Sequence, residues 1–465
     1  MTTNDQQITP ADAAIVSSGT GTKGPEERDL PASLKEEMDL CLQILREVLG
    51  EFDEQLLASF DEVRGYALNA SAERFAGILT DTNPDQDDLQ NVVNTVDKLD
   101  MHDAQLLARA FATYFHLANL CEENYRVSVL HKRETAVDEN QAVDPVNEMT
   151  GAYHQLINEL GPAKARDLLD KLEFHPVFTA HPTEARRKAV EGKIRRISRL
   201  LEAHKLLGGS DKKENSRRLF NEIDALFRTS PIALKKPTPV EEADTILDIF
   251  DNTLFYTIPQ VYRRFDDWVL GDKAGLVPPM CPAFFHPGSW IGSDRDGNPN
   301  VTAKVSRQVA RKFSDHVLGA LEIETRTVGK NLTMEAGTTP PSDELKSLWN
   351  HQKEMSERLT DKAALISTKE MHRAVMLVMA DRLHYTIERD ADLMYHSCDE
   401  FLEDLKIVQR SLAAANAKRS AYGPVQDLIW QTETFGFHMV EMEFRQHSVV
   451  HSRALEDIRE HGLHG

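Results

Sequence analysis

The feature that most constrains the fold is an apolar pattern with helical spacing along most of the chain. From Leu34 onward, apolar residues recur at steps of three and four, as in the series Leu107, Phe111, Tyr114, Ala118, Cys121 and Tyr125. This spacing places the series on one face of a long helix, where it predicts core packing. Residues 1–30 lack the pattern and are rich in Ser, Thr, Gly and Pro, so we predict a disordered tail followed by a helical region over 31–172.

Three short runs have strand character instead, at 174–180 (FHPVFTA), 283–290 (AFFHPGSW) and 438–445 (HMVEMEFR). The first two lead into a polar tip and then a helical pattern, which is the strand–loop–helix unit of α/β folds. The fold is therefore predicted to be mostly α with a few β strands, the strands lying in a second region over 173–465.

One helix start can be located from its capping chemistry. Thr238 can cap, Pro239 suits the first turn, and Glu241 stands where it can reach back to the cap. The helix is expected to run towards Trp268 and to kink near Pro259.

Composition excludes several classes of function. The chain has 465 residues, with 54 Lys and Arg against 75 Asp and Glu, and a formal charge of −21. Such acidity disfavours nucleic acid and anionic membranes as partners. No apolar window is long enough to span a bilayer, and the first residues do not form a secretory signal. The 4 cysteines are far apart, so a cytoplasmic protein without disulfides is expected.

The first polar tip contains His181, which follows the first strand and precedes a helix that Thr183 can cap. Unpaired N–H groups at such a helix start favour an anion, and an imidazole beside it could exchange protons near neutral pH. Residues 184–205 contain eight Lys and Arg against three Glu, a local charge of +5. The alternative is a capping histidine beside a solvated basic helix.

The second tip, 290–299, is dense in Gly, Asn and Asp. It copies the start of a calcium loop, but Pro299 and Val305 occupy positions that need Gly and Glu, so that interpretation fails. Arg295 between two aspartates could position a phosphate or carboxylate. The alternative is simply a well-formed turn.

The third candidate is Arg445 at the end of the last strand-like run. Strand alternation places it on the same side as Glu441 and Glu443, so it could bind a phosphate or pair with either carboxylate. His447 and His451 have no evident third ligand, and no metal site is predicted in this chain.

Together these segments identify a family. The stretches 177–184 (VFTAHPTE), 236–239 (KPTP), 289–299 (SWIGSDRDGNP) and 444–446 (FRQ) resemble phosphoenolpyruvate carboxylase in order and separation. The resemblance runs from about residue 35 to the end and covers the N-terminal half of the family's chain. Ser293 replaces a usual second glycine, and Phe227 replaces a common tryptophan.

The resemblance implies a fold and an assembly. The family has an α/β barrel of the TIM type embedded in many helices, so residues 173–465 should form its N-terminal half, incomplete at the C-terminus. The family's catalytic lysine, mobile loop and metal-binding acidic pair belong to the half that is not matched. We therefore expect a fragment that is inactive alone. Full-length members form homotetramers.

The resemblance also implies a reaction. The family joins bicarbonate to phosphoenolpyruvate, giving oxaloacetate and phosphate, with Mg²⁺ or Mn²⁺ held by the missing half. By resemblance, His181 accepts a proton from carboxyphosphate and stabilises it, and Arg445 grips the substrate phosphate. Trp290 and Arg295 match the wall near that site.

Three alternatives remain at this point. The chain could be a non-catalytic helical protein that binds an anionic metabolite or a partner, or an inert truncation that aggregates. It could also be a histidine phosphotransfer protein that uses His181 as the phosphoryl carrier.

Overall fold

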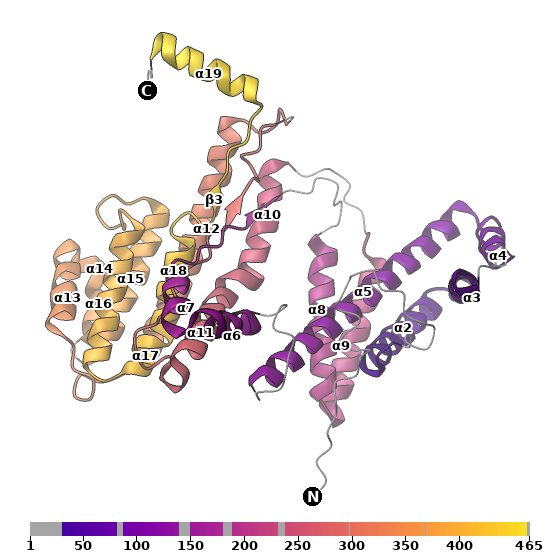
Figure 1. Cartoon of the computed structure of the whole chain (residues 1–465), viewed down its shortest axis with the longest axis horizontal. Coiled ribbons are helices and arrows are strands. Elements are labelled where there is room, and N and C mark those ends of the chain that lie inside the picture. The colour runs from indigo at the N-terminus through magenta and orange to yellow at the C-terminus, as the bar shows by residue number, and fades with distance from the viewer. Residues whose placement is uncertain are drawn as a thin grey trace, which may run out of the picture. The chain divides into compact units, whose positions relative to one another are not determined.

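The computed structural model describes residues 30–80, 87–138, 149–179, 188–230, 238–296, 298–367 and 369–462. Helices make up nearly all of its regular structure, and three strands of two residues each complete it (Figure 1). The predicted mostly-α fold with a few strands is therefore confirmed. Residues 1–29, which contain nearly all of the predicted tail, lie outside the described residues. No helix within the described ranges is both long and apolar enough to cross a membrane.

Contacts divide the chain into two units, 1–144 with 183–236 and 145–182 with 237–465. The predicted regions, 31–172 and 173–465, follow sequence order and stay a prediction. The helices of the first unit are α2 (Ala32–Phe52), α3 (Glu54–Thr80), α4 (Asp87–Val96), α5 (Met101–Asp138), α8 (Lys188–Leu206) and α9 (Gly209–Arg228).

The apolar series on α5 faces the core of the first unit, as its spacing predicts. Leu107, Cys121 and Tyr125 are buried, and Phe111 packs against the same core. Phe227 is 1% exposed and meets the ring of Phe52 edge-on, 5.3 Å between centroids, so a phenylalanine fills this position without a tryptophan's bulk.

The second unit surrounds a larger apolar core with helices. Its elements before the second strand are α6 (Met149–Leu160), α7 (Pro162–Leu169), β1 (Val177–Phe178), α10 (Pro239–Ile249), the π-helical turn η2 (Phe250–Leu254), α11 (Phe255–Leu270) and η3 (Gly271–Lys273). Those that follow are β2 (Gly288–Ser289), α12 (Ala303–Asn331), α13 (Asp343–Met355), α14 (Glu357–Ser367), α15 (Met371–Glu388), α16 (Cys398–Ala414), α17 (Lys418–Tyr422), α18 (Pro424–Phe435), β3 (Glu441–Met442) and α19 (Ser448–His461).

The predicted capping box opens α10. Glu241 N–H donates to the Thr238 hydroxyl at 3.3 Å, and Thr238 N–H donates to the Glu241 carboxylate at 2.7 Å. The irregularity expected near Pro259 takes the form of the π-helical turn η2 just before it. Proline removes the hydrogen bond to the carbonyl four residues earlier, and the Gln431 amide donates to that Phe255 oxygen at 2.8 Å instead.

The three strands form one parallel sheet in the order β1-β2-β3. Val177 pairs with Gly288, and Gly288 pairs with Glu441, so all three strand-like runs of the sequence meet side by side. The sheet is parallel and each strand is followed by a helix, which fits the strand–loop–helix units expected from the sequence. Three strands do not by themselves establish half of a barrel.

Candidate functional site

The carboxyl ends of parallel strands share one edge of a sheet, so the polar segments that follow β2 and β3 lie there together. Pairing continues past β2 and β3 through a parallel bridge between Asp294 and Arg445. Arg295 N–H donates to the Arg445 carbonyl at 2.8 Å, and Arg445 N–H donates to the Ser293 carbonyl at 3.3 Å. The turn after β2 is thereby fixed beside the segment after β3.

Arg445 and Trp290 meet at this edge. The Arg445 guanidinium lies 4.0 Å from the centroid of the Trp290 ring, a cation–π contact. Trp290 Nε1 donates to the Glu443 carboxylate at 2.8 Å, which fixes the plane of the ring. An ion pair of 3.8 Å joins Arg445 to Asp294, so the pairing with Glu441 or Glu443 considered from the sequence is not the one found.

Arg445 keeps hydrogen-bonding capacity for a ligand. Its side chain is 43% exposed, and its guanidinium makes no hydrogen bond to any protein acceptor in the described ranges. An arginine fork held on an aromatic face is well suited to a phosphate or carboxylate, because its donors are planar and always charged.

Arg295 is directed elsewhere. Its guanidinium lies 5.5 Å from the centroid of Phe444 and donates to the Ser306 hydroxyl on α12 at 3.4 Å. Neighbouring residues on an extended segment point to opposite sides. Because Arg295 contacts Phe444, its guanidinium lies on the side of the segment opposite to the Arg445 side chain. The Arg295 Nε is buried without a hydrogen-bond partner among the described residues.

The turn after β2, which carries Arg295, depends on one glycine. Gly292 has a φ of +75°, and a Cβ atom there would lie 2.7 Å from Cγ2 of Val309. Ser306, which sequence reasoning missed, donates its hydroxyl to the Gly292 carbonyl at 2.7 Å. Ser293 is fully buried and donates to the Ser289 carbonyl at 3.3 Å, so a serine fits where glycine is usual.

Two further results concern the predicted site. His181 lies outside the described residues, so its place relative to Arg445 is not described. Glu443 was recognised in the sequence only as a possible partner of Arg445, whereas it binds Trp290. Its position two residues before Arg445 was the available signal.

Within the described ranges no group of three or more His, Cys, Asp or Glu residues could hold a metal ion.

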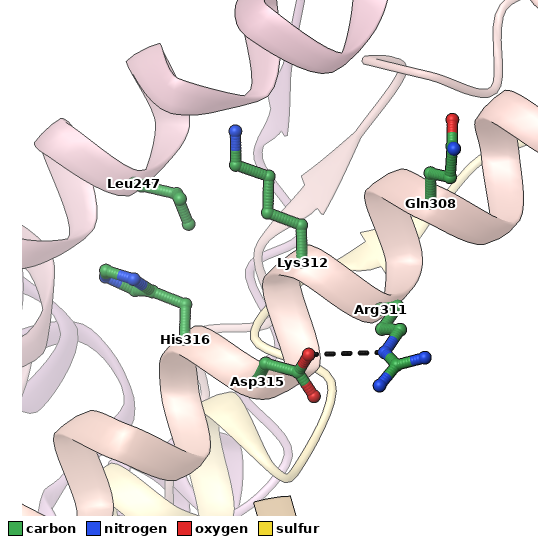
Figure 2. Close-up of a pocket in the computed structure, with 6 residues that line it drawn as sticks. All are labelled: Leu247, Gln308, Arg311, Lys312, Asp315 and His316. Atoms are coloured by element: carbon green, nitrogen blue, oxygen red, sulfur yellow. Dashed lines mark hydrogen bonds and ion pairs between the residues drawn. The ribbon is translucent and has the colours of Figure 1, made fainter.

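A separate pocket lies between α10 and α12 and has a volume of about 500 Å³ (Figure 2). Its basic side chains are bound by acidic groups. Arg311 pairs with Asp315 at 3.4 Å, His316 binds Asp251 at 2.7 Å, and Lys312 binds Asp244. Trp290, Arg295 and Arg445 are not among the described residues that line this pocket, and each of its basic side chains is paired with an acidic group.

The fold and this edge define a mostly helical protein with a small parallel sheet, which presents an arginine and a tryptophan at the carboxyl ends of its strands. Comparison then gives the family, since the model of phosphoenolpyruvate carboxylase matches residues 34–463. The chain belongs to the phosphoenolpyruvate carboxylase family.

Individual relatives agree in name and differ in length. The phosphoenolpyruvate carboxylase of Roseiflexus castenholzii is 31% identical over 375 residues, which cover 78% of this chain and 40% of that protein. That of Synechocystis is 27% identical, covering 96% of this chain and 47% of the relative, and that of Medicago sativa is 29% identical, covering 91% and 45%. The chain thus spans less than half the length of these relatives.

Proposed function

We propose that this chain supplies the substrate-binding edge of a phosphoenolpyruvate carboxylase, which carboxylates phosphoenolpyruvate with bicarbonate to give oxaloacetate and phosphate. The observation that carries the proposal is the Arg445 guanidinium held 4.0 Å over Trp290 at the carboxyl ends of the strands. Phosphoenolpyruvate carries a phosphate and a carboxylate, and a planar guanidinium fork binds either group. Trp290 forms the apolar wall beside it.

The nearby charges favour an exchange of partners when substrate binds. Asp294 lies 3.8 Å from Arg445, at the outer limit of an ion pair, and both side chains are more than one-third exposed. Such a pair contributes little in water, so a dianionic phosphate can replace the carboxylate at small cost. We assign His181 the role of proton acceptor and stabiliser of carboxyphosphate, and Arg295 the role of holding the turn after β2 through its hydrogen bond to Ser306.

We further propose that the chain does not complete the reaction alone. The family's Mg²⁺ or Mn²⁺ requires carboxylate ligands, and the described residues contain no group of three or more His, Cys, Asp or Glu side chains placed to hold a metal ion. The chain matches 40 to 47% of the length of the relatives named above. By the family resemblance, we assign the ligands of the Mg²⁺ or Mn²⁺ ion to the part of the relatives that this chain does not match.

Binding and catalysis should be tested separately. In a titration followed by tryptophan fluorescence, we expect phosphoenolpyruvate to bind the wild-type chain and Arg445→Gln to weaken it roughly tenfold or more, since a charge-assisted hydrogen bond is lost. Arg453→Gln, on the exposed helix α19, is the matched control and should bind normally. Equal binding by both variants, or none by wild type, would refute the assignment of Arg445.

Catalysis is followed as oxaloacetate formation with malate dehydrogenase and NADH, in phosphoenolpyruvate, bicarbonate and Mg²⁺. The purified chain should give no signal. A signal that requires bicarbonate and disappears in His181→Asn would show that this chain suffices and contradict the proposed incompleteness. Binding without turnover is also the outcome expected for a non-catalytic anion-binding protein. Adding the C-terminal half of a relative distinguishes the two, because only an incomplete enzyme can gain activity.

A further inference from the structure

Residues 188–205 of the basic stretch noted in the sequence lie on α8 in the first unit, where they contribute to a groove lined by arginines. Helices α8 and α9 pack on each other and leave a groove of about 520 Å³. Its charged lining consists of Arg196 and Arg199 from α8 and Glu214, Arg217, Arg218 and Glu222 from α9. This volume lies within the range of pockets that hold small organic ligands.

The charge of this helix pair is opposite to that of the whole chain. Residues 188–228 contain eleven Lys and Arg against six Asp and Glu, a surplus of five positive charges, whereas the chain carries −21. A positive groove on an acidic protein concentrates the potential that attracts small anions. Four of the five surplus charges belong to α8 and one belongs to α9.

The carboxylates in the groove do not neutralise it. Glu214 accepts hydrogen bonds from Arg217 at 2.9 Å and from Arg218 at 3.2 Å. These two bonds lower the pKa of Glu214, so it stays ionised and holds both arginines in place.

The other carboxylate is shared in the same way. Glu222 accepts from Arg196 at 3.0 Å and lies 3.7 Å from Lys193. Arg199 has no hydrogen bond or ion pair with any of the described residues. Four arginines thus line the groove against two carboxylates, and the Arg199 guanidinium has no partner in the described part of the chain.

We propose that this groove binds a small organic molecule with two anionic groups, phosphate or carboxylate. Arg196 and Arg199 are one helical turn apart on α8 and can take one group, while Arg217 and Arg218 on α9 take the other. Leu200 and the aliphatic stems of the arginines provide an apolar lining for the body of the ligand. The site is independent of Arg445 and of the proposed carboxylase function.

The test is calorimetric titration of the full chain with inorganic pyrophosphate and, separately, with succinate. We expect one-to-one binding of at least one probe, and its identity tells which anionic group is preferred. The double variant Arg199→Gln with Arg218→Gln should weaken binding at least tenfold. Arg126→Gln, an exposed arginine of the same unit paired only within its own helix, should bind as wild type, and so should Arg445→Gln.

A second measurement needs no variant. Phenylglyoxal modification followed by mass spectrometry should label Arg199 in the free chain and be slowed by pyrophosphate or succinate. The proposal is overturned if neither probe binds, if Arg126→Gln weakens binding as much as the double variant, or if Arg445→Gln abolishes it. Binding without protection of Arg199 would also overturn it.

Discussion

Replacement of Arg382 by methionine tests the charge cluster that joins α15 to α16. The Arg382 side chain is 2% exposed, and it donates to Glu400 and, at 3.3 Å, to Asp404. Tyr395 donates its hydroxyl to Asp404 at 2.9 Å, and its ring lies 3.7 Å from the guanidinium carbon. Glu400, Asp404 and Tyr395 therefore depend on one buried cation.

The expected loss follows from that burial. Methionine fills much of the space but leaves two carboxylates without their cation, and removing one partner of a buried ion pair costs about 3–5 kcal/mol. Glu400 is 36% exposed and recovers part of its hydration, which favours the lower end, about 3 kcal/mol.

The loss should also depend on pH. Burial already raises the pKa of Asp404 to about 6, against an ordinary value of 3.8, although Arg382 lowers it. Without Arg382 the pKa rises further, so the folded variant takes up a proton that the unfolded chain does not bind. A raised pKa contributes stability that is lost as pH rises through it. The destabilisation should therefore be smaller at pH 5 than at pH 8.

Urea unfolding followed by tryptophan fluorescence measures the free energy of unfolding of the second unit at each pH. The signal reports this unit because it contains Trp268, Trp290, Trp349 and Trp430. The matched control is Arg410→Met, whose exposed ion pairs should contribute less than 1 kcal/mol. A loss no larger than the control's, or one that grows towards pH 5, would refute the reasoning.

Three further predictions use the same assays. Gly292→Ala should lower the stability of the second unit by roughly 1–3 kcal/mol, because the φ of +75° and the nearby Val309 both oppose a Cβ atom. The control Gly319→Ala, which has open space around the glycine, should not destabilise the unit. Burial lowers the pKa of His372 to about 4 from 6.5, so only the unfolded chain is protonated between these values. The titration of His372 should therefore lower the stability of wild type relative to His372→Gln by about 3 kcal/mol from pH 7 to pH 4, and an equal pH dependence of the two proteins would contradict the assignment. Burial raises the pKa of the Cys398 thiol to about 12, so at pH 8 a disulfide reagent should label it far more slowly in native than in unfolded protein, and equal rates would contradict its burial.

Much of the fold was predictable because its signals are local. Helical spacing located the buried face of α5, and Thr238 with Glu241 located the start of α10, since each depends on residues within a few positions of one another. The three strand-like runs were also recognisable, although only two residues in each are paired as strand. His181 and Arg445 were selected on residue type and position, and the family followed from four short motifs.

The tertiary structure decided what distant segments do to one another. It brought Trp290 and Arg445 together across more than 150 positions, assigned Glu443 to the indole, and turned Arg295 towards Ser306 instead of Arg445. It also assembled the arginine groove from two helices. Local patterns limit each segment to a few conformations, but the neighbours of a side chain depend on how whole elements pack, and that packing is settled by the sum of many contacts between segments far apart in the sequence.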